Sequence, residues 1–202
     1  MLASISPVGE ASRHQRWTVT VAAYLVASTV GGAVVGGLAG LLGVGLVAAI
    51  GRPPQVALVG ALAVLGLFGV LVDRGVIRWA LPSWQRQVDE RWLTSYRGWV
   101  YGAGFGFQLG AGLFTRIATS ATYLMLAAAV ATASLPAGLL IGAVFGGVRA
   151  LPILLTAPLR DPQRLNRFHR RMDDATRLAD RATSVAVLAT VGVAFVAALA
   201  TG

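Results

Sequence analysis

The sequence has no cysteine, and it has few residues of the kinds that carry out chemistry. Without cysteine the chain forms no disulfide, offers no thiol nucleophile and builds no thiolate metal site. The two histidines, His14 and His169, lie far apart in polar segments, which argues against a histidine metal site. The sequence contains no carboxylate pair, Ser/His/Asp set or metal constellation. We therefore expect no enzyme activity, no catalytic residue and no cofactor or metal.

Lysine is also missing, and all 17 basic residues are arginine. The formal net charge of the chain is +9. The arginines flank apolar runs and do not form one basic face, so the charge does not indicate a nucleic-acid partner. Lysine and arginine are retained on the cytoplasmic side of membranes. The excess of arginine therefore predicts how a membrane protein is oriented.

Charge of either sign is absent from long stretches of the chain. The runs without Asp, Glu, Lys or Arg are 17–51, 53–72, 98–115, 117–148 and 182–202. A helix needs about 20 apolar residues to cross roughly 30 Å of hydrocarbon. The chain is 56% hydrophobic, with a mean hydropathy of +0.71. We therefore expect an all-α, polytopic transmembrane bundle in which residues 1–202 form a single domain.

Three basic segments set the predicted topology: the N-terminal tail, 73–97 and 149–181. If all three are cytoplasmic, an even number of crossings separates each pair. This rule favours a cytoplasmic N-terminus and five crossings, in 17–51, 53–72, 98–133, 137–157 and 182–202. Splitting 98–133 at Arg116 gives six crossings instead, and that alternative stays open.

Two of these blocks, 17–51 and 98–133, are too long for a simple crossing. At 1.5 Å per residue each would make a helix of about 50 Å, which exceeds the thickness of the hydrocarbon layer. Both blocks are rich in glycine. We expect each of them to tilt, to protrude from the membrane or to break.

Parts of the basic segments have the pattern of interfacial helices. In 83–97, Trp84 and Trp92 belong to an apolar row with a four-residue spacing, which places them on one face. In 161–181, Leu165 belongs to an apolar stripe and most arginines lie off it. Such helices lie in the membrane interface, with arginine facing anionic headgroups. We predict that both helices are cytoplasmic and bind the lipid bilayer, with a protein partner as the alternative.

The segments 30–82 and 100–152 match at an offset of 70 residues. The matching pairs are Gly32/Gly102, Ala33/Ala103, Gly36/Gly106, Gly40/Gly110, Ala80/Ala150, Leu81/Leu151 and Pro82/Pro152. Transporters are often built from such duplications, with the solute site between the two repeats. Because the matches fall on common residue types, coincidence remains the alternative.

Glycine recurs every four residues in three rows. The rows are Gly32, Gly36 and Gly40; Gly102, Gly106 and Gly110; and Gly138, Gly142 and Gly146. This spacing makes a smooth groove on one face of a helix, so a neighbouring backbone can approach closely. We predict that the rows pack helices against each other within one subunit. Homo-oligomer contacts and a solute path lined by small residues are the alternatives.

Arg116 is the one charged residue between Arg97 and Arg149. The candidate solute-binding residues are Arg116 and its polar neighbours Gln108, Thr115, Thr119, Ser120 and Tyr123. A charge inside a membrane costs roughly 2.5–3.5 kcal/mol on insertion scales and usually marks a pathway or a paired site. A guanidinium among hydroxyl groups suits an anion or a carboxylate. The alternative is that Arg116 lies at the far interface and reaches water as an anchor.

The glycine-rich stretch 101–115, Tyr-Gly-Ala-Gly-Phe-Gly-Phe-Gln-Leu-Gly-Ala-Gly-Leu-Phe-Thr, resembles the start of the second reactive helix in membrane thiol transporters of the DsbD/CcdA type. The stretch 142–152, Gly-Ala-Val-Phe-Gly-Gly-Val-Arg-Ala-Leu-Pro, extends this resemblance. The resemblance implies six helices in duplicated three-helix halves. The reactive cysteines of that family have no counterpart here, which excludes thiol–disulfide transfer by this chain alone.

Two functions remain from this reasoning. Related members of the LysE-like superfamily export small solutes, and the resemblance therefore implies a small transporter. The other function is a non-catalytic membrane subunit or scaffold of a larger complex. Broken helices beside a polar site favour the transporter, whereas dry, continuous packing and a wide apolar face favour the scaffold. The chain also resembles small membrane proteins of high-GC bacteria, which implies the bacterial cytoplasmic (inner) membrane.

Overall fold

The computed structural model describes residues 5–77, 96–112, 120–157 and 192, and the regular elements in these ranges are all helical. They are α1 (Pro7–Ser12), α2 (Trp17–Ile50), α3 (Gln55–Asp73), α5 (Gly98–Ala111), α6 (Ala121–Thr132), α7 (Leu135–Ala150) and the 3-10 helix η1 (Leu151–Thr156). By length and composition, α2, α3 and the stretch Leu135–Thr156 can each cross a membrane, and α6 is a shorter apolar helix. The predicted all-α membrane class is thus confirmed.

Some predicted features lie outside the described residues. They are the interfacial helix 161–181, nearly all of the interfacial helix 83–97, the final crossing 182–202 apart from residue 192, and the candidate ligands Thr115, Arg116 and Thr119. The choice between five and six crossings therefore stays a prediction.

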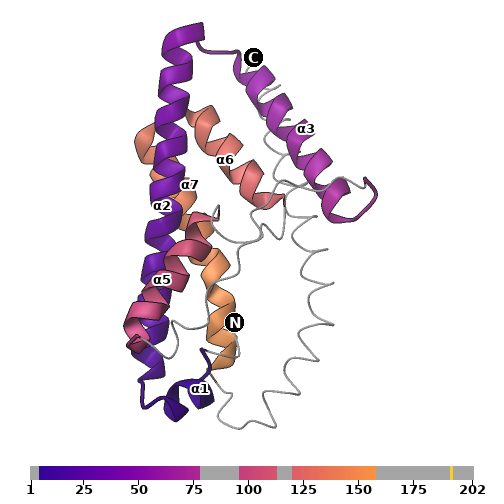
Figure 1. Ribbon diagram of the computed structural model, residues 1–202. Helices are drawn as coiled ribbons and strands as arrows, with labels where there is room; N and C mark the ends of the chain where they lie inside the picture. The colour runs from indigo at the N-terminus through magenta and orange to yellow at the C-terminus, as the bar shows by residue number, and fades with distance from the viewer. Residues whose placement is uncertain (1–4, 78–95, 113–119, 158–191, 193–202) are drawn as a thin grey trace.

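The central element is α2, which runs as one continuous helix of 34 residues (Figure 1). It ends at Gly51, which has a positive φ of 82°, and Pro53 and Pro54 follow directly. Of the three outcomes expected for the long glycine-rich blocks, a break does not occur in this one. Its glycines are buried against other helices, and backbone groups in apolar surroundings are satisfied within an unbroken helix.

Two helices pack closely along α2, in opposite directions. Along α5, Gly102 meets the Thr20 carbonyl and Gly110 meets that of Ser28, so α5 runs parallel to α2. Along α7 the order is opposite: Gly146 meets Ser28, whereas Gly138, earlier in α7, meets Gly36 and Gly40, later in α2. The helix α7 therefore runs antiparallel to α2. The backbones are so close that a Cβ atom built on Gly36 would come within 2.8 Å of the Cα atom of Gly142.

The block 98–133 forms two helices instead of one. α5 ends at Ala111, and Gly112 follows in the left-handed conformation with a φ of 69°. α6 starts beyond this interruption and ends at the level of Gly43 in α2, which contacts the Val130 carbonyl. Both helices therefore advance in the direction of α2. The prediction of a break in a long glycine-rich block holds for this one.

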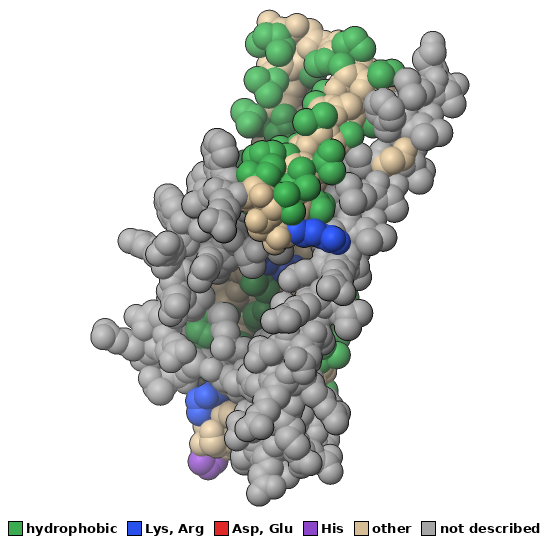
Figure 2. Space-filling model, turned by 90° about the vertical axis from the view of Figure 1, so that its right-hand side faces the viewer, with side chains coloured by type: hydrophobic (Ala, Val, Ile, Leu, Met, Phe, Trp, Pro, Cys, Tyr) green, Lys and Arg blue, Asp and Glu red, His purple; other side chains and the backbone are tan. Residues whose placement is uncertain are grey.

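The α2–α3 end of the molecule is strongly apolar. α3 packs against α6 and inclines away from α2 as it descends (Figure 1). Figure 2 shows apolar side chains gathered over this end of the molecule. Large exposed side chains here include Leu41, Leu42, Leu46 and Ile50 of α2 and Val64, Leu67 and Phe68 of α3. Hydrocarbon is the solvent that such a surface suits.

The opposite end is closed by an elbow, residues 5–16, that folds back under α2 and α5. Ser6 caps α1 by accepting a hydrogen bond from Gly9 N, and Pro7 occupies the first helical position. Ile5 is 1% exposed and joins the hydrophobic core that α2, α5, α7 and η1 form. The indole nitrogen of Trp17 donates to the Ile5 carbonyl over 3.2 Å. The elbow is therefore fixed by both apolar burial and hydrogen bonds.

Candidate functional site at an interrupted helix

The interruption between α5 and α6 has a defined structure at both of its ends. The N–H group of Gly112 donates to the carbonyls of Gln108 and Leu109 over 3.3 and 3.2 Å, which closes the last turn of α5. At the other end, the Ser120 N–H group lies 3.0 Å from both carboxylate oxygens of Asp73, and its hydroxyl donates to one of them over 2.8 Å. The carboxylate of α3 thus caps α6, where the helix dipole favours negative charge.

A guanidinium reaches the α5 side of this interruption. Arg149, in the last turn of α7, is half-buried and donates from Nη1 to the Thr122 hydroxyl over 3.4 Å. The same nitrogen would lie 3.3 Å from a Cβ atom built on Gly112. The Arg149 Cζ atom also stands 5.8 Å from the ring centre of Phe145. Glycine at position 112 therefore provides room for the guanidinium at the end of α5.

The side chains around Arg149 are polar on the α2 and α6 sides. Thr122 is 1% exposed and Ser28 is fully buried. The Ser28 hydroxyl donates to the Gly146 carbonyl over 2.7 Å, which links α2 to α7 one turn before Arg149. Tyr24 lies close enough to Arg149 for an electrostatic interaction. Two helices, α2 and α6, therefore contribute hydroxyl groups to the region of one cation on α7.

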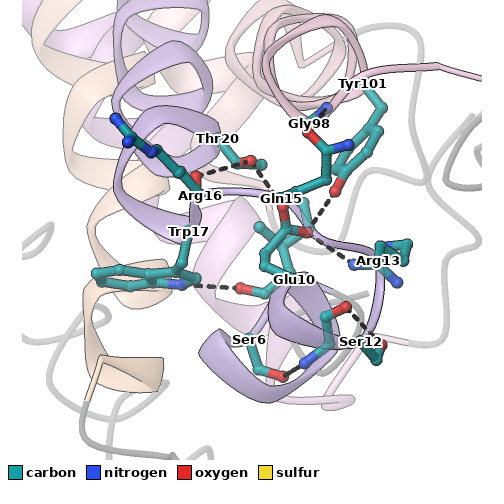
Figure 3. A network of polar contacts seen from close by, with 12 residues as sticks. Ser6, Glu10, Ser12, Arg13, Gln15, Arg16, Trp17, Thr20, Gly98 and Tyr101 are labelled. Carbon is teal, nitrogen blue, oxygen red and sulfur yellow. Dashed lines mark hydrogen bonds and ion pairs between the residues drawn. The ribbon is translucent and has the colours of Figure 1, made fainter.

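A second polar network ties the elbow to α2 and α5, as Figure 3 shows. Glu10 is fully buried and accepts hydrogen bonds from Arg13 Nη2 over 2.7 Å, from the Thr20 hydroxyl over 2.7 Å and from the Tyr101 hydroxyl. Arg13 also stacks over the Tyr101 ring, with its Cζ atom 5.6 Å from the ring centre. Nearby, Gln15 accepts from the Gly98 N–H group over 3.1 Å and satisfies the start of α5.

The charges of this network reinforce each other. Burial lowers the pKa of Arg13, but its hydrogen bonds with Glu10 and Tyr101 outweigh that effect and raise the pKa above its ordinary value. Arg13 is thus cationic wherever the protein is folded, and it supplies the charge that a buried Glu10 carboxylate needs. Since all three partners of Glu10 donate to it, the buried carboxylate is satisfied, which explains how the elbow is held.

Of the predicted ligands, the structure describes Gln108, Ser120 and Tyr123. Gln108 lies half-buried in the last turn of α5, and Ser120 and Tyr123 lie half-buried at the start of α6, where Ser120 binds Asp73. The predicted glycine rows lie at the contacts of α2 with α5 and α7, and they face backbone atoms of the opposite helix. In the described part of the chain, no three of His, Cys, Asp or Glu lie close enough to hold a metal.

Sequence reasoning missed two residues that the fold makes prominent, Arg149 and Glu10. Arg149 was grouped with the basic segment 149–181, although the predicted crossing 137–157 includes it. An arginine inside a predicted crossing was therefore the available signal. Nothing in the sequence near Glu10 indicates burial, because its partners Thr20 and Tyr101 are 10 and 91 residues away.

Comparison with known proteins gives one relation. No protein-family model matches the chain, and no solved structure matches it. The chain is similar to the methylamine utilization protein MauF of Methylorubrum extorquens, with 31% identity over 159 residues, or 77% of this chain and 52% of that protein. For MauF of Methylophilus methylotrophus the identity is 29% over 72% of this chain and 50% of the relative. For MauF of Paracoccus versutus the identity is 29% over 95% of this chain and 68% of the relative.

The chain spans about half the length of the first two of these relatives. The resemblance to thiol transporters of the DsbD/CcdA type is a separate observation and stays a prediction. From its apolar helices and this similarity, the chain is a membrane protein distantly related to the methylamine utilization protein MauF.

Proposed function

We propose that this protein is a small transporter that carries a small anionic solute across the bacterial cytoplasmic membrane. The observation that supports this most is the interruption of the block 98–133 beside the continuous helix α2. Transporters form solute sites from discontinuous helices, because the free backbone groups and helix ends at a break can bind ions and polar solutes. The proposal gives the chain no catalytic role.

The cationic charge on the α5 side of the interruption supports an anionic solute, whereas the Asp73 carboxylate lies at the start of α6. Arg149 reaches the end of α5, and the predicted ligand Arg116 belongs to the connection between α5 and α6. Methylammonium, the cation that methylamine forms in neutral water, would be repelled by a guanidinium. The process in the relatives' name therefore does not identify methylamine as the solute, and we propose an anion instead.

A membrane subunit or scaffold is the second candidate function. The close glycine contacts of α2 with α5 and α7, together with the wide apolar end of α2 and α3, favour it. A scaffold needs a fixed bundle and a lateral surface for a partner, which is either a second copy or another membrane protein. In that case the interruption would be a packing detail with no solute.

The test is solute flux in liposomes that contain the purified full-length chain. Acetate, lactate and inorganic phosphate would each be supplied outside, and entry would be followed by a radiolabel against protein-free liposomes. Methylamine serves as the cationic comparison. Saturable uptake of at least one anion, several-fold above the protein-free rate, is the expected result. Flux at the protein-free rate for all of them would contradict transport of these anions and leave the scaffold favoured.

A further inference from the structure

We propose that Arg149 is the anion ligand of this protein, and that with the hydroxyl group of Thr122 it forms a subsite for a small monocarboxylate. This inference deepens the proposed transport function and rests on it for its biological meaning. Binding of the carboxylate can nevertheless be measured without transport. Arg149 thereby takes the role that the sequence assigned to Arg116.

The position of Arg149 in the bundle is fixed by the packing of α7. Gly142 and Gly146 bring this helix into backbone contact with α2. One turn further, Ala150 and Ile153 are each 1% exposed and anchor the helix end in the core. Arg149 therefore cannot swing away with its helix. Its side chain points to the interruption, toward Gly112 and Thr122.

The charge of Arg149 is not balanced by an acid in the described ranges. There, the one ion pair joins Glu10 to Arg13, and Arg149 makes a single hydrogen bond, which at 3.4 Å is long. A guanidinium has five N–H donors. The contact with the Phe145 ring stabilises the cation through the ring face. The half-buried side chain thus retains donors for a ligand.

The chemistry of these groups favours a carboxylate. The planar fork of arginine matches the two oxygens of a carboxylate and binds them through two parallel hydrogen bonds. The Thr122 hydroxyl accepts from Arg149, and a hydroxyl that accepts one hydrogen bond can still donate another. One guanidinium, which has no acidic partner among the described residues, is neutralised by one negative charge. A monocarboxylate therefore fits the site better than a dianion or an amine.

The size of the ligand is limited by the end of α5. A Cβ atom on Gly112 would lie 3.3 Å from Arg149 Nη1 and 3.0 Å from Thr122 Cγ2. The space beside the guanidinium is thus closed on the α5 side by backbone and on the α6 side by a buried threonine. A ligand beside the guanidinium therefore has little space on these two sides, and a carboxylate with a short substituent fits this limit best.

The test uses the full-length protein in nanodiscs of zwitterionic phosphatidylcholine, with acetate as the probe. Acetate binding would be measured from the rise of the unfolding temperature with acetate concentration, since a ligand that binds the folded state stabilises it. Arg149→Gln should weaken acetate binding at least tenfold. Thr122→Val should weaken it by a smaller factor. The matched control is Arg52→Gln, at an exposed loop arginine, which should bind acetate within twofold of the unchanged protein.

Arg149→Lys is a second variant in case Arg149→Gln fails to fold, since lysine keeps the positive charge but lacks the planar guanidinium. It should unfold near the temperature of the unchanged protein and bind acetate more weakly. Acetate binding of normal strength in Arg149→Gln, or no acetate binding by the unchanged protein, would overturn the assignment. Loss of acetate binding in phosphatidylglycerol nanodiscs would also overturn it, by assigning the guanidinium to lipid headgroups.

The two proposals fail in different ways. If acetate binds through Arg149 but no anion crosses the liposome membrane, the subsite stands and the transport function falls. If anions are transported equally well by Arg149→Gln, transport stands and the subsite falls.

Discussion

At the residue scale, the glycines of this protein divide into two kinds. Those at the α2–α7 and α2–α5 contacts face the backbone of another helix, whereas Gly45 and Gly60 have open space where a Cβ atom would lie. The two kinds cannot be told apart by sequence, because Gly45 also lies in a glycine-rich stretch of α2. Substitution by alanine distinguishes them.

Gly142→Ala should destabilise the protein strongly, because a Cβ atom there overlaps the backbone of Gly32. Overpacking of a well-packed interior costs about 1–3 kcal/mol, and backbone cannot move aside as a side chain can. The unfolding temperature of the purified protein in detergent measures the effect. Gly45→Ala is the matched control and should leave that temperature unchanged or raise it, since alanine favours a helix over glycine by about 1 kcal/mol. Equal behaviour of the two variants would contradict the close packing.

Glu10→Gln should loosen the elbow. The change keeps the shape of the side chain but removes the charge that pairs with Arg13, and breaking a buried ion pair costs on the order of 3–5 kcal/mol. Because Arg13 is partly exposed, we expect the lower end of that range or less. Limited proteolysis between residues 5 and 16 reports the loosening directly. Ser12→Ala removes only an exposed hydrogen bond to Gly9 and should be cleaved no faster than the unchanged chain.

At the scale of elements, the interruption is held by a cap from a different helix. Asp73 closes α3 and binds the first N–H group of α6, so the start of α6 depends on the position of α3. Gly69 allows this contact, because a Cβ atom there would come within 2.6 Å of the Ser120 Cβ atom. α3 and α6 should therefore move together.

Asp73→Ala should fray the first turn of α6, because the Ser120 N–H group and hydroxyl lose their acceptor. Loss of an N-cap costs about 1 kcal/mol, so the fold should survive and the effect should be local. Faster amide hydrogen exchange at residues 120–124, with α7 unchanged, is the expected observation. Asp73→Asn retains an acceptor oxygen and should show a smaller change. Uniformly faster exchange throughout the bundle would indicate a general loss of stability instead.

At the scale of the whole molecule, two pairs of connecting segments mark the two ends of α2. The turn after α2 and the turn between α6 and α7 lie together, since Arg52 Nη2 donates to the Thr132 carbonyl over 3.4 Å. The elbow and the start of α5 lie together at the other end, where Gln15 binds Gly98. The block 98–133 therefore begins at one end and finishes at the other.

We predict that these two ends lie on opposite sides of the membrane, with the elbow in the cytoplasm. Since the chain has no cysteine, single substitutions Arg52→Cys, Ser134→Cys and His14→Cys can be labelled in whole cells with an impermeant maleimide. Arg52→Cys and Ser134→Cys should be labelled alike from outside, and His14→Cys only after the cells are opened. Labelling of Arg52→Cys and Ser134→Cys from opposite sides would contradict the single passage of 98–133.

The sequence by itself determined that the described elements are helices and that the protein belongs in a membrane. The reason is local: a long run without charge has a favourable transfer into hydrocarbon whatever its neighbours are, and its backbone must then be helical. The same local reasoning identified 98–133 as a block too long for one simple crossing, and this block forms two helices. That reasoning left open whether α2 breaks, because burial of the α2 glycines against other helices was not visible in the run itself.

The tertiary structure alone decided which polar groups meet. Ser28 donates to a carbonyl 118 residues away, and the buried Glu10 accepts from Tyr101. Arg149, at the edge of a basic segment in the sequence, contacts Thr122 beside the interruption. Each of these contacts depends on the register of one helix against another. That register follows from the glycine contacts of the assembled bundle. A four-residue spacing of glycine in the sequence predicts close packing, but it does not show which helix packs there.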